Sequence, residues 1–73
     1  MKYDNEMTFK VLSYDTNLGY HFCVDEKEKT HWIDLNVSSV FEGVTDEWFI
    51  GKTFVGEVKP YKYIAYRFEE VKK

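Results

Sequence analysis

The stretch GYHFCVDEKEKTHWIDLNV, residues 19–37, contains two runs in which the residues of one face alternate with those of the other. Alternation with a period of two is typical of a strand with one buried face, so this stretch predicts strands over residues 19–25 and 30–37. The second run has the clearer pattern. One of its faces carries Ile33, Leu35 and Val37, and the other carries Trp32, Asp34 and Asn36. The charged residues 26–29 between the runs are too polar to bury, and they predict the loop of a hairpin.

Three further strands are expected on either side of this hairpin. Alternating runs predict strands over residues 7–13, 53–59 and 63–71. The turn between the first two strands falls at residues 15–19, where aspartate, asparagine and glycine favour a tight reversal of the chain. Gly56 interrupts the fourth strand and indicates a bulge or a tight barrel corner, because glycine permits a close approach of two backbones.

One short helix is predicted between the third and fourth strands, in the segment TDEWFI at residues 45–50. Thr45 is placed to cap it, and two acids follow in the first turn. A helix this short cannot hold itself together, so we expect Trp48, Phe49 and Ile50 to plug one end of a barrel. The order of three strands, a helix and two strands predicts an all-β, five-stranded antiparallel barrel of the oligonucleotide/oligosaccharide-binding (OB) type.

Length and composition limit what such a barrel can be. Its 73 residues suffice for one small domain, in which residues 1–6 and 72–73 are expected to fray, and an aromatic content of 19% supplies large apolar area. The single cysteine, Cys23, excludes an internal disulfide. Only two separated histidines accompany it, so we expect no metal and no other cofactor. The polar N-terminal segment contains no apolar run, which predicts a cytoplasmic protein without a membrane partner.

The register of the hairpin decides which aromatic side chains face solvent. A symmetric loop pairs Phe22 with Ile33 and places Phe22 and Tyr20 in the core. Symmetry in the preceding turn sets Val11 opposite Phe22, again apolar against apolar, so we favour this register. A one-residue bulge in the charged loop would instead turn both aromatic side chains outward, beside Trp32.

The symmetric register also places His21, Cys23 and Asp34 on one face, which superficially resembles a cysteine nucleophile with its base. An exposed sheet face offers neither a cleft nor an oxyanion hole, however. We therefore predict a non-catalytic protein with a cross-strand pair of His21 and Asp34 and a half-buried thiol at Cys23.

Three segments have an order and spacing similar to the cold-shock domain family: KVLS at residues 10–13, LGYHFCV at 18–24 and HWIDL at 31–35. The resemblance implies a platform for single-stranded nucleic acid, with Tyr20, Phe22 and Trp32 as stacking residues and Lys10 as a phosphate contact.

The sequence departs from the family pattern at three positions. Val11 replaces a tryptophan, Asp34 a histidine and Leu35 the last phenylalanine of the platform. Because an aspartate repels phosphate, these departures count against nucleic-acid binding by the family's full platform.

A second candidate surface lies in the segment KPYKY that follows the fourth strand. There Tyr61 and Tyr63 are predicted to stack on bases, and Lys59, Lys62 and Arg67 to meet phosphates. The last fifteen residues support this prediction, because they carry five basic and only two acidic side chains. The alternative is that the tyrosines cover the barrel end while the lysines extend into solvent.

Two kinds of partner are consistent with these features. Single-stranded RNA or DNA is narrowly favoured by the cold-shock-like pattern, the aromatic content and the basic C-terminal segment. The alternative is another protein, bound by an acidic adaptor or a small inhibitor such as a mobile element encodes, which the net charge of −3 favours. An exposed strand edge is compatible with either a monomer or a homodimer.

Overall fold

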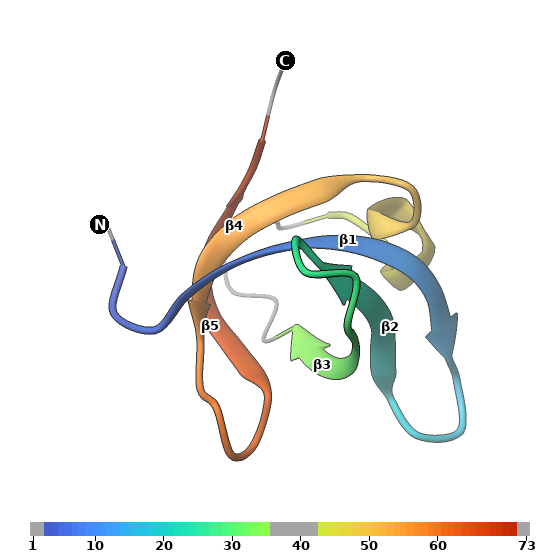
Figure 1. Cartoon of the computed structure of the whole chain (residues 1–73). Coiled ribbons are helices and arrows are strands. Elements are labelled where there is room, and N and C mark those ends of the chain that lie inside the picture. Colours follow the sequence, from blue (N-terminus) through green and yellow to red (C-terminus); the bar gives the residue numbers. More distant parts are fainter. Residues whose placement is uncertain (1–2, 36–42, 72–73) are drawn as a thin grey trace.

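In a computed structural model that describes residues 3–35 and 43–71, the chain forms a closed barrel (Figure 1). The elements in chain order are β1 (Glu6–Asp15), β2 (Tyr20–Asp25), β3 (Thr30–Leu35), the 3₁₀ helix η2 (Asp46–Phe49), β4 (Thr53–Val58) and β5 (Ile64–Glu70). Around the barrel the strand order is β1-β2-β3-β5-β4, and β4 pairs with β1 to close it. The predicted all-β, five-stranded barrel of the OB type is confirmed.

One detail of the predicted barrel differs, because β3 and β5 run parallel. Asp34 pairs with Ile64 and Leu35 with Ala65. A closed ring with an odd number of strands cannot alternate direction throughout, so at least one neighbouring pair must be parallel. Asn36 and Val37, whose faces were predicted, lie outside the described residues, and so do positions 1–2 and 72–73.

The barrel interior is largely aromatic. Four buried phenylalanines, Phe9, Phe49, Phe54 and Phe68, have ring centroids 5.5 to 6.3 Å from their neighbours. The other buried apolar residues are Val11, Cys23, Ile33, Leu35, Val58 and Ala65. Each buried phenylalanine contributes about 2 to 3 kcal/mol by leaving water, which is how so short a chain can build a sufficient core.

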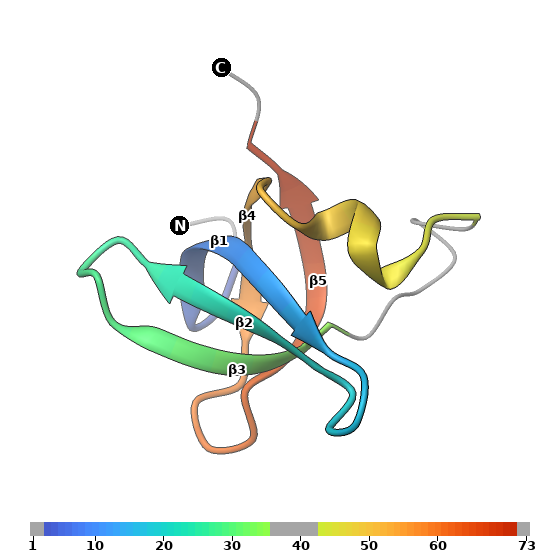
Figure 2. The same ribbon diagram turned by 90° about the vertical axis from the view of Figure 1, so that its right-hand side faces the viewer.

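The helix η2 closes one end of the barrel beside β1 (Figures 1 and 2). Phe49 is fully buried and Trp48 packs partly against the core, as predicted, whereas Ile50 is 40% exposed and does not belong to the plug. Thr45 begins the helix through its carbonyl oxygen, which accepts a hydrogen bond from the Trp48 N–H at 3.1 Å, but its side chain forms no cap. None of the helices in the described ranges is long and apolar enough to span a membrane.

The register favoured for the β2–β3 hairpin is wrong by one residue. The observed pairs are His21 with Ile33 and Phe22 with Trp32. The cause is a loop of odd length: the Asp25 N–H donates to the Lys29 carbonyl, and Glu28 takes a left-handed conformation with φ of 64°. Compared with the predicted even loop, an odd loop shifts the register by one residue and moves every side chain of one strand to the opposite face. The alternative with an outward-facing Phe22 is therefore the one observed.

A bulge at Leu12 adjusts β1 to this register. Val11 lies opposite Cys23, whereas Ser13 lies opposite Phe22, so Leu12 is the extra residue and its side chain is exposed. The predicted pairing of Val11 with Phe22 is therefore wrong. Val11 and Phe9 still face the interior, as their shared phase predicts.

Gly56 marks the predicted close approach of β4. It pairs with Met7 on one side and Phe68 on the other, and Phe54 and Val58 flank it in the buried phase. The register shift lies just beyond it, where Glu57 pairs with Arg67 but Val58 pairs with Ala65. This shift breaks the alternation expected for the fifth strand and exposes Tyr66, while Ala65 and Phe68 are buried.

Candidate nucleic-acid interface

The shifted register gathers three aromatic side chains on the outer face of β2 and β3. We call Tyr20, Phe22 and Trp32 the aromatic face. Phe22 and Trp32 are cross-strand partners whose ring centroids lie 4.6 Å apart at an interplanar angle of 43°. Trp32 is 43% exposed, Tyr20 is exposed and Phe22 is half-buried between its neighbours. Base stacking needs accessible aromatic side chains, and Tyr20 and Trp32 are exposed here.

Lys10 lies on the same outer surface, on the neighbouring strand β1. It pairs with Val24 and is exposed, while Phe9 and Val11 on either side of it point inward. The structure thus brings together the four residues that the cold-shock resemblance implicates. Val11 and Leu35 are buried, so two of the three departures from the family pattern lie in the core, outside this face.

The loop after β4 provides the second predicted surface. The β1–β2 and β4–β5 loops project from the same side of the barrel in both views (Figures 1 and 2). Tyr61 is 97% exposed at the tip of the β4–β5 loop, and Lys59 and Lys62 are exposed beside it. These three side chains are therefore accessible to a ligand.

Two other predicted members of this surface are engaged within the protein. Tyr63 packs partly against the core, and its carbonyl oxygen accepts a hydrogen bond from the Asp34 N–H at 2.8 Å. The Arg67 guanidinium forms an ion pair with Glu57 at 3.0 Å and lies 5.5 Å from the ring centroid of Tyr3. Arg67 is thus already paired with an acid, which weakens it as a phosphate ligand.

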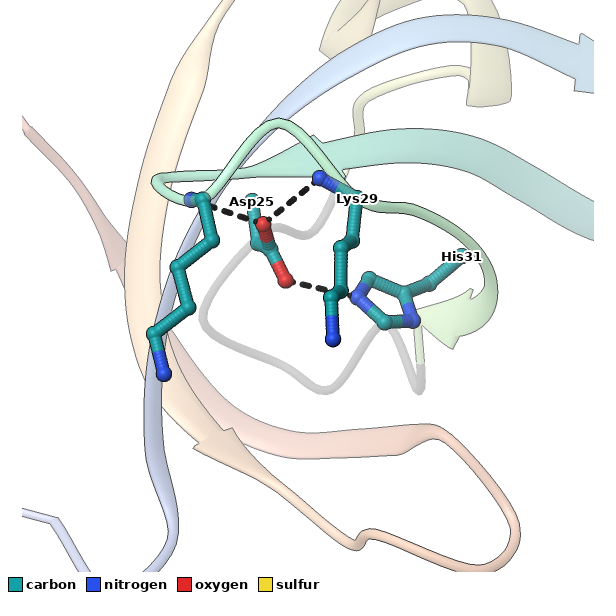
Figure 3. A network of polar contacts seen from close by, with 4 residues as sticks. Asp25, Lys29 and His31 are labelled. Carbon is teal, nitrogen blue, oxygen red and sulfur yellow. Dashed lines mark hydrogen bonds and ion pairs between the residues drawn. The ribbon is translucent and has the colours of Figure 1, made fainter.

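A polar network that the sequence did not indicate lies within the β2–β3 hairpin, where Asp25, Lys29 and His31 come together (Figure 3). His31 Nε2 lies 2.8 Å from Asp25 Oδ2, and the His31 ring stacks on Tyr63 with centroids 4.9 Å apart. Asp25 Oδ1 accepts hydrogen bonds from the backbone N–H groups of Lys27 and Lys29 at 2.8 and 2.9 Å. The hydrogen bond from His31 and those from the loop backbone hold the pKa of Asp25 below its ordinary value.

The substitution Asp25→Asn is expected to lower stability at neutral pH and to have no effect in strong acid. A carboxyl group whose pKa is lower in the folded state stabilises the fold while it is ionised. That contribution is present above the ordinary value of 3.8 and is lost as the pH falls through the lower folded value. The melting temperatures of the wild type and Asp25→Asn should therefore differ at pH 7 and converge as the pH falls to 2. A difference that persists unchanged at pH 2 would contradict this role of the charge.

The grouping of His21, Cys23 and Asp34 on one face is not observed. His21 and Cys23 point into the core, and His21 Nε2 donates to the Asp46 carbonyl oxygen at 2.9 Å, so the predicted pair of His21 and Asp34 does not form. Cys23 is fully rather than half-buried, and burial raises the pKa of its thiol to about 12. Among the described residues, no group of three histidine, cysteine or acidic side chains is placed to hold a metal ion.

Comparison with known proteins identifies no relative of this chain. No protein-family model matches it, and neither a curated protein nor a solved structure is significantly similar to it. The fold is that of a small OB-type β-barrel, and the aromatic face with the adjoining β4–β5 loop is its candidate functional site.

Proposed function

We propose that this protein is a non-catalytic, cytoplasmic binding module for single-stranded nucleic acid, with bases stacked on the aromatic face. The observation that carries the proposal is the outward orientation of Phe22 and Trp32, whose rings form a pair on the barrel surface. In a small domain that needs aromatic area for its core, large rings left in solvent call for a partner. Stacking on such rings contributes about 1 to 3 kcal/mol per base.

Exposed lysines provide the charge that the phosphates of such a ligand require. Lys10 lies on the outer surface next to the aromatic face, and Lys59 and Lys62 lie in the β4–β5 loop. The net charge of −3 opposes binding at long range, so the proposed affinity is modest and sensitive to salt. The match of Lys10, Tyr20, Phe22 and Trp32 to the cold-shock pattern supports a divergent member of that class.

The test is a fluorescence titration of two matched variants with short single-stranded oligonucleotides. Trp48→Phe leaves Trp32 as the reporter on the aromatic face. Trp32→Phe leaves Trp48, which is half-buried at the barrel end beneath the Lys52 ammonium group, 4.4 Å from its ring centroid. Saturable quenching is expected in the first variant and little change in the second.

The salt dependence of the same titration measures the phosphate contacts. Three lysines that each meet a phosphate of a single strand predict a slope of about −2 in a plot of log affinity against log salt. An absence of quenching in both variants at low salt would refute base stacking on the aromatic face.

A protein partner is the second candidate function, and one observation favours it. Leu12 and Leu18 are also exposed, and aliphatic side chains contribute little to base stacking. If oligonucleotides do not bind, we expect a protein partner to contact this exposed apolar surface.

A further inference from the structure

Asp34 occupies the centre of the proposed binding surface. It follows Trp32 by two residues on β3, and the two side chains share the outer face because Ile33 and Leu35 are buried. Residues two apart on a strand are about 7 Å apart, which is close to the width of a nucleobase. Extending the observed pairing of His21 with Ile33 by one residue brings Asp34 opposite Tyr20.

The β4–β5 loop borders Asp34 on its other side. The Asp34 backbone N–H donates to the Tyr63 carbonyl oxygen at 2.8 Å, and Asp34 pairs with Ile64 where β3 meets β5. A carboxylate thus lies at the junction of the aromatic face and the basic loop.

The Asp34 side chain has no use inside the protein that the structure reveals. Among residues 3–35 and 43–71, its carboxylate forms no hydrogen bond or ion pair. An ionised carboxylate only accepts hydrogen bonds, and it repels phosphate. On a nucleic-acid surface it is unfavourable unless it meets a hydrogen-bond donor. Within a DNA single strand, the donors are the N–H groups on the base edges.

Base chemistry selects among these donors. The Watson–Crick edge of guanine presents two adjacent donors, the ring N1–H and the exocyclic amino group, which match the two oxygens of a carboxylate. Adenine and cytosine each place a ring acceptor beside their amino group, and thymine flanks its single N–H with two carbonyl oxygens. On the basis of the proposed function, we infer that Asp34 is a specificity-determining residue that selects guanine for the base stacked at Trp32.

The test compares three heptamers of single-stranded DNA: oligothymidine, the same strand with a central guanine, and the same strand with a central hypoxanthine. Hypoxanthine retains the N1–H of guanine and lacks its amino group, so it removes one of the two donors. The wild-type protein is expected to bind the guanine strand about tenfold more tightly than oligothymidine, since thymine offers no second donor for a bidentate contact. The hypoxanthine strand should be intermediate.

Asp34→Asn supplies the matched variant, because it keeps the size of the side chain and removes one acceptor and the charge. We expect it to lose the guanine preference while it binds oligothymidine at least as tightly as the wild type. Circular dichroism and thermal melting check that the variant is folded, and Asp34→Ser serves as a second replacement if Asn destabilises the barrel.

The possible outcomes separate this inference from the proposed function. Equal affinity of the wild type for all three strands would overturn the role of Asp34 and leave nucleic-acid binding intact. A guanine preference that survives in both variants would also overturn it, since another group would then read the base. If none of the strands binds, the proposed function fails and the inference fails with it.

Discussion

Replacing Gly56 by alanine is expected to lower the melting temperature of the barrel by more than 10 °C. A Cβ atom at this position would overlap the carbonyl oxygen of Arg67 and the Cα and Cβ atoms of Phe68 on β5. These are atoms of the backbone and its first side-chain carbon, so no rotamer change can relieve the overlap, and β4 and β5 must separate. Overpacking of this kind costs about 3 kcal/mol, which in so small a domain lowers the melting temperature by about 12 to 24 °C.

A second glycine provides the control for this experiment. Gly19 has a φ of 75°, and a Cβ there would have no neighbour within 4 Å. Gly19→Ala therefore introduces backbone strain without overlap, and its expected cost is only about 1 to 2 kcal/mol. Thermal melts followed by circular dichroism should show the larger loss for Gly56→Ala. Equal losses in the two variants would mean that β4 and β5 are farther apart at Gly56 than the structure indicates.

Gly56 illustrates how much of the fold the sequence could predict. A lone glycine in an alternating run has few explanations, and close strand packing is the main one. The alternation of Ile33 and Leu35 with Trp32 and Asp34 was equally informative, because the period of two survives wherever a strand is regular.

Local irregularities limited the prediction of the site. The direction of Phe22 depends on one left-handed residue, Glu28, and glutamate is not a residue type that signals this conformation. The hydrogen bonds that Asp25 accepts from the loop backbone offset the strain and fix the odd loop length. A register error of one residue then placed Phe22 in the core and His21 on the surface, the reverse of the structure.

Contacts between distant segments were beyond the reach of sequence periodicity. His31 and Tyr63 lie in different hairpins, and their stacking depends on the parallel pairing of β3 with β5. Nothing in the spacing of either residue indicates that pairing. The position of Asp34 next to the β4–β5 loop follows from the same pairing, which is why its proposed role could only be inferred from the closed barrel.

Truncation of both paired rings, Phe22→Leu with Trp32→Leu, is expected to weaken oligonucleotide binding at least about 100-fold, since each ring contributes about 1 to 3 kcal/mol of stacking. The single variants should each lose about tenfold. Leucine keeps an apolar side chain at both surface positions, so the fold should be retained. Anisotropy of a labelled oligonucleotide measures the affinity without depending on tryptophan emission.

Tyr66→Leu is the control that makes this loss specific to the aromatic face. Tyr66 is 41% exposed, close to the value for Trp32, but it lies on β5, where Lys59 Nζ is 5.2 Å from its ring centroid. If bases stack on β2 and β3, Tyr66→Leu loses at most the phosphate contact of Lys59, so its affinity falls far less than that of the double variant at Phe22 and Trp32. If Tyr66→Leu weakens binding while the double variant at Phe22 and Trp32 does not, the ligand stacks on the β5 side of the barrel. The outward-facing pair of Phe22 and Trp32 would then need a partner other than nucleic acid, because neither ring belongs to the buried core.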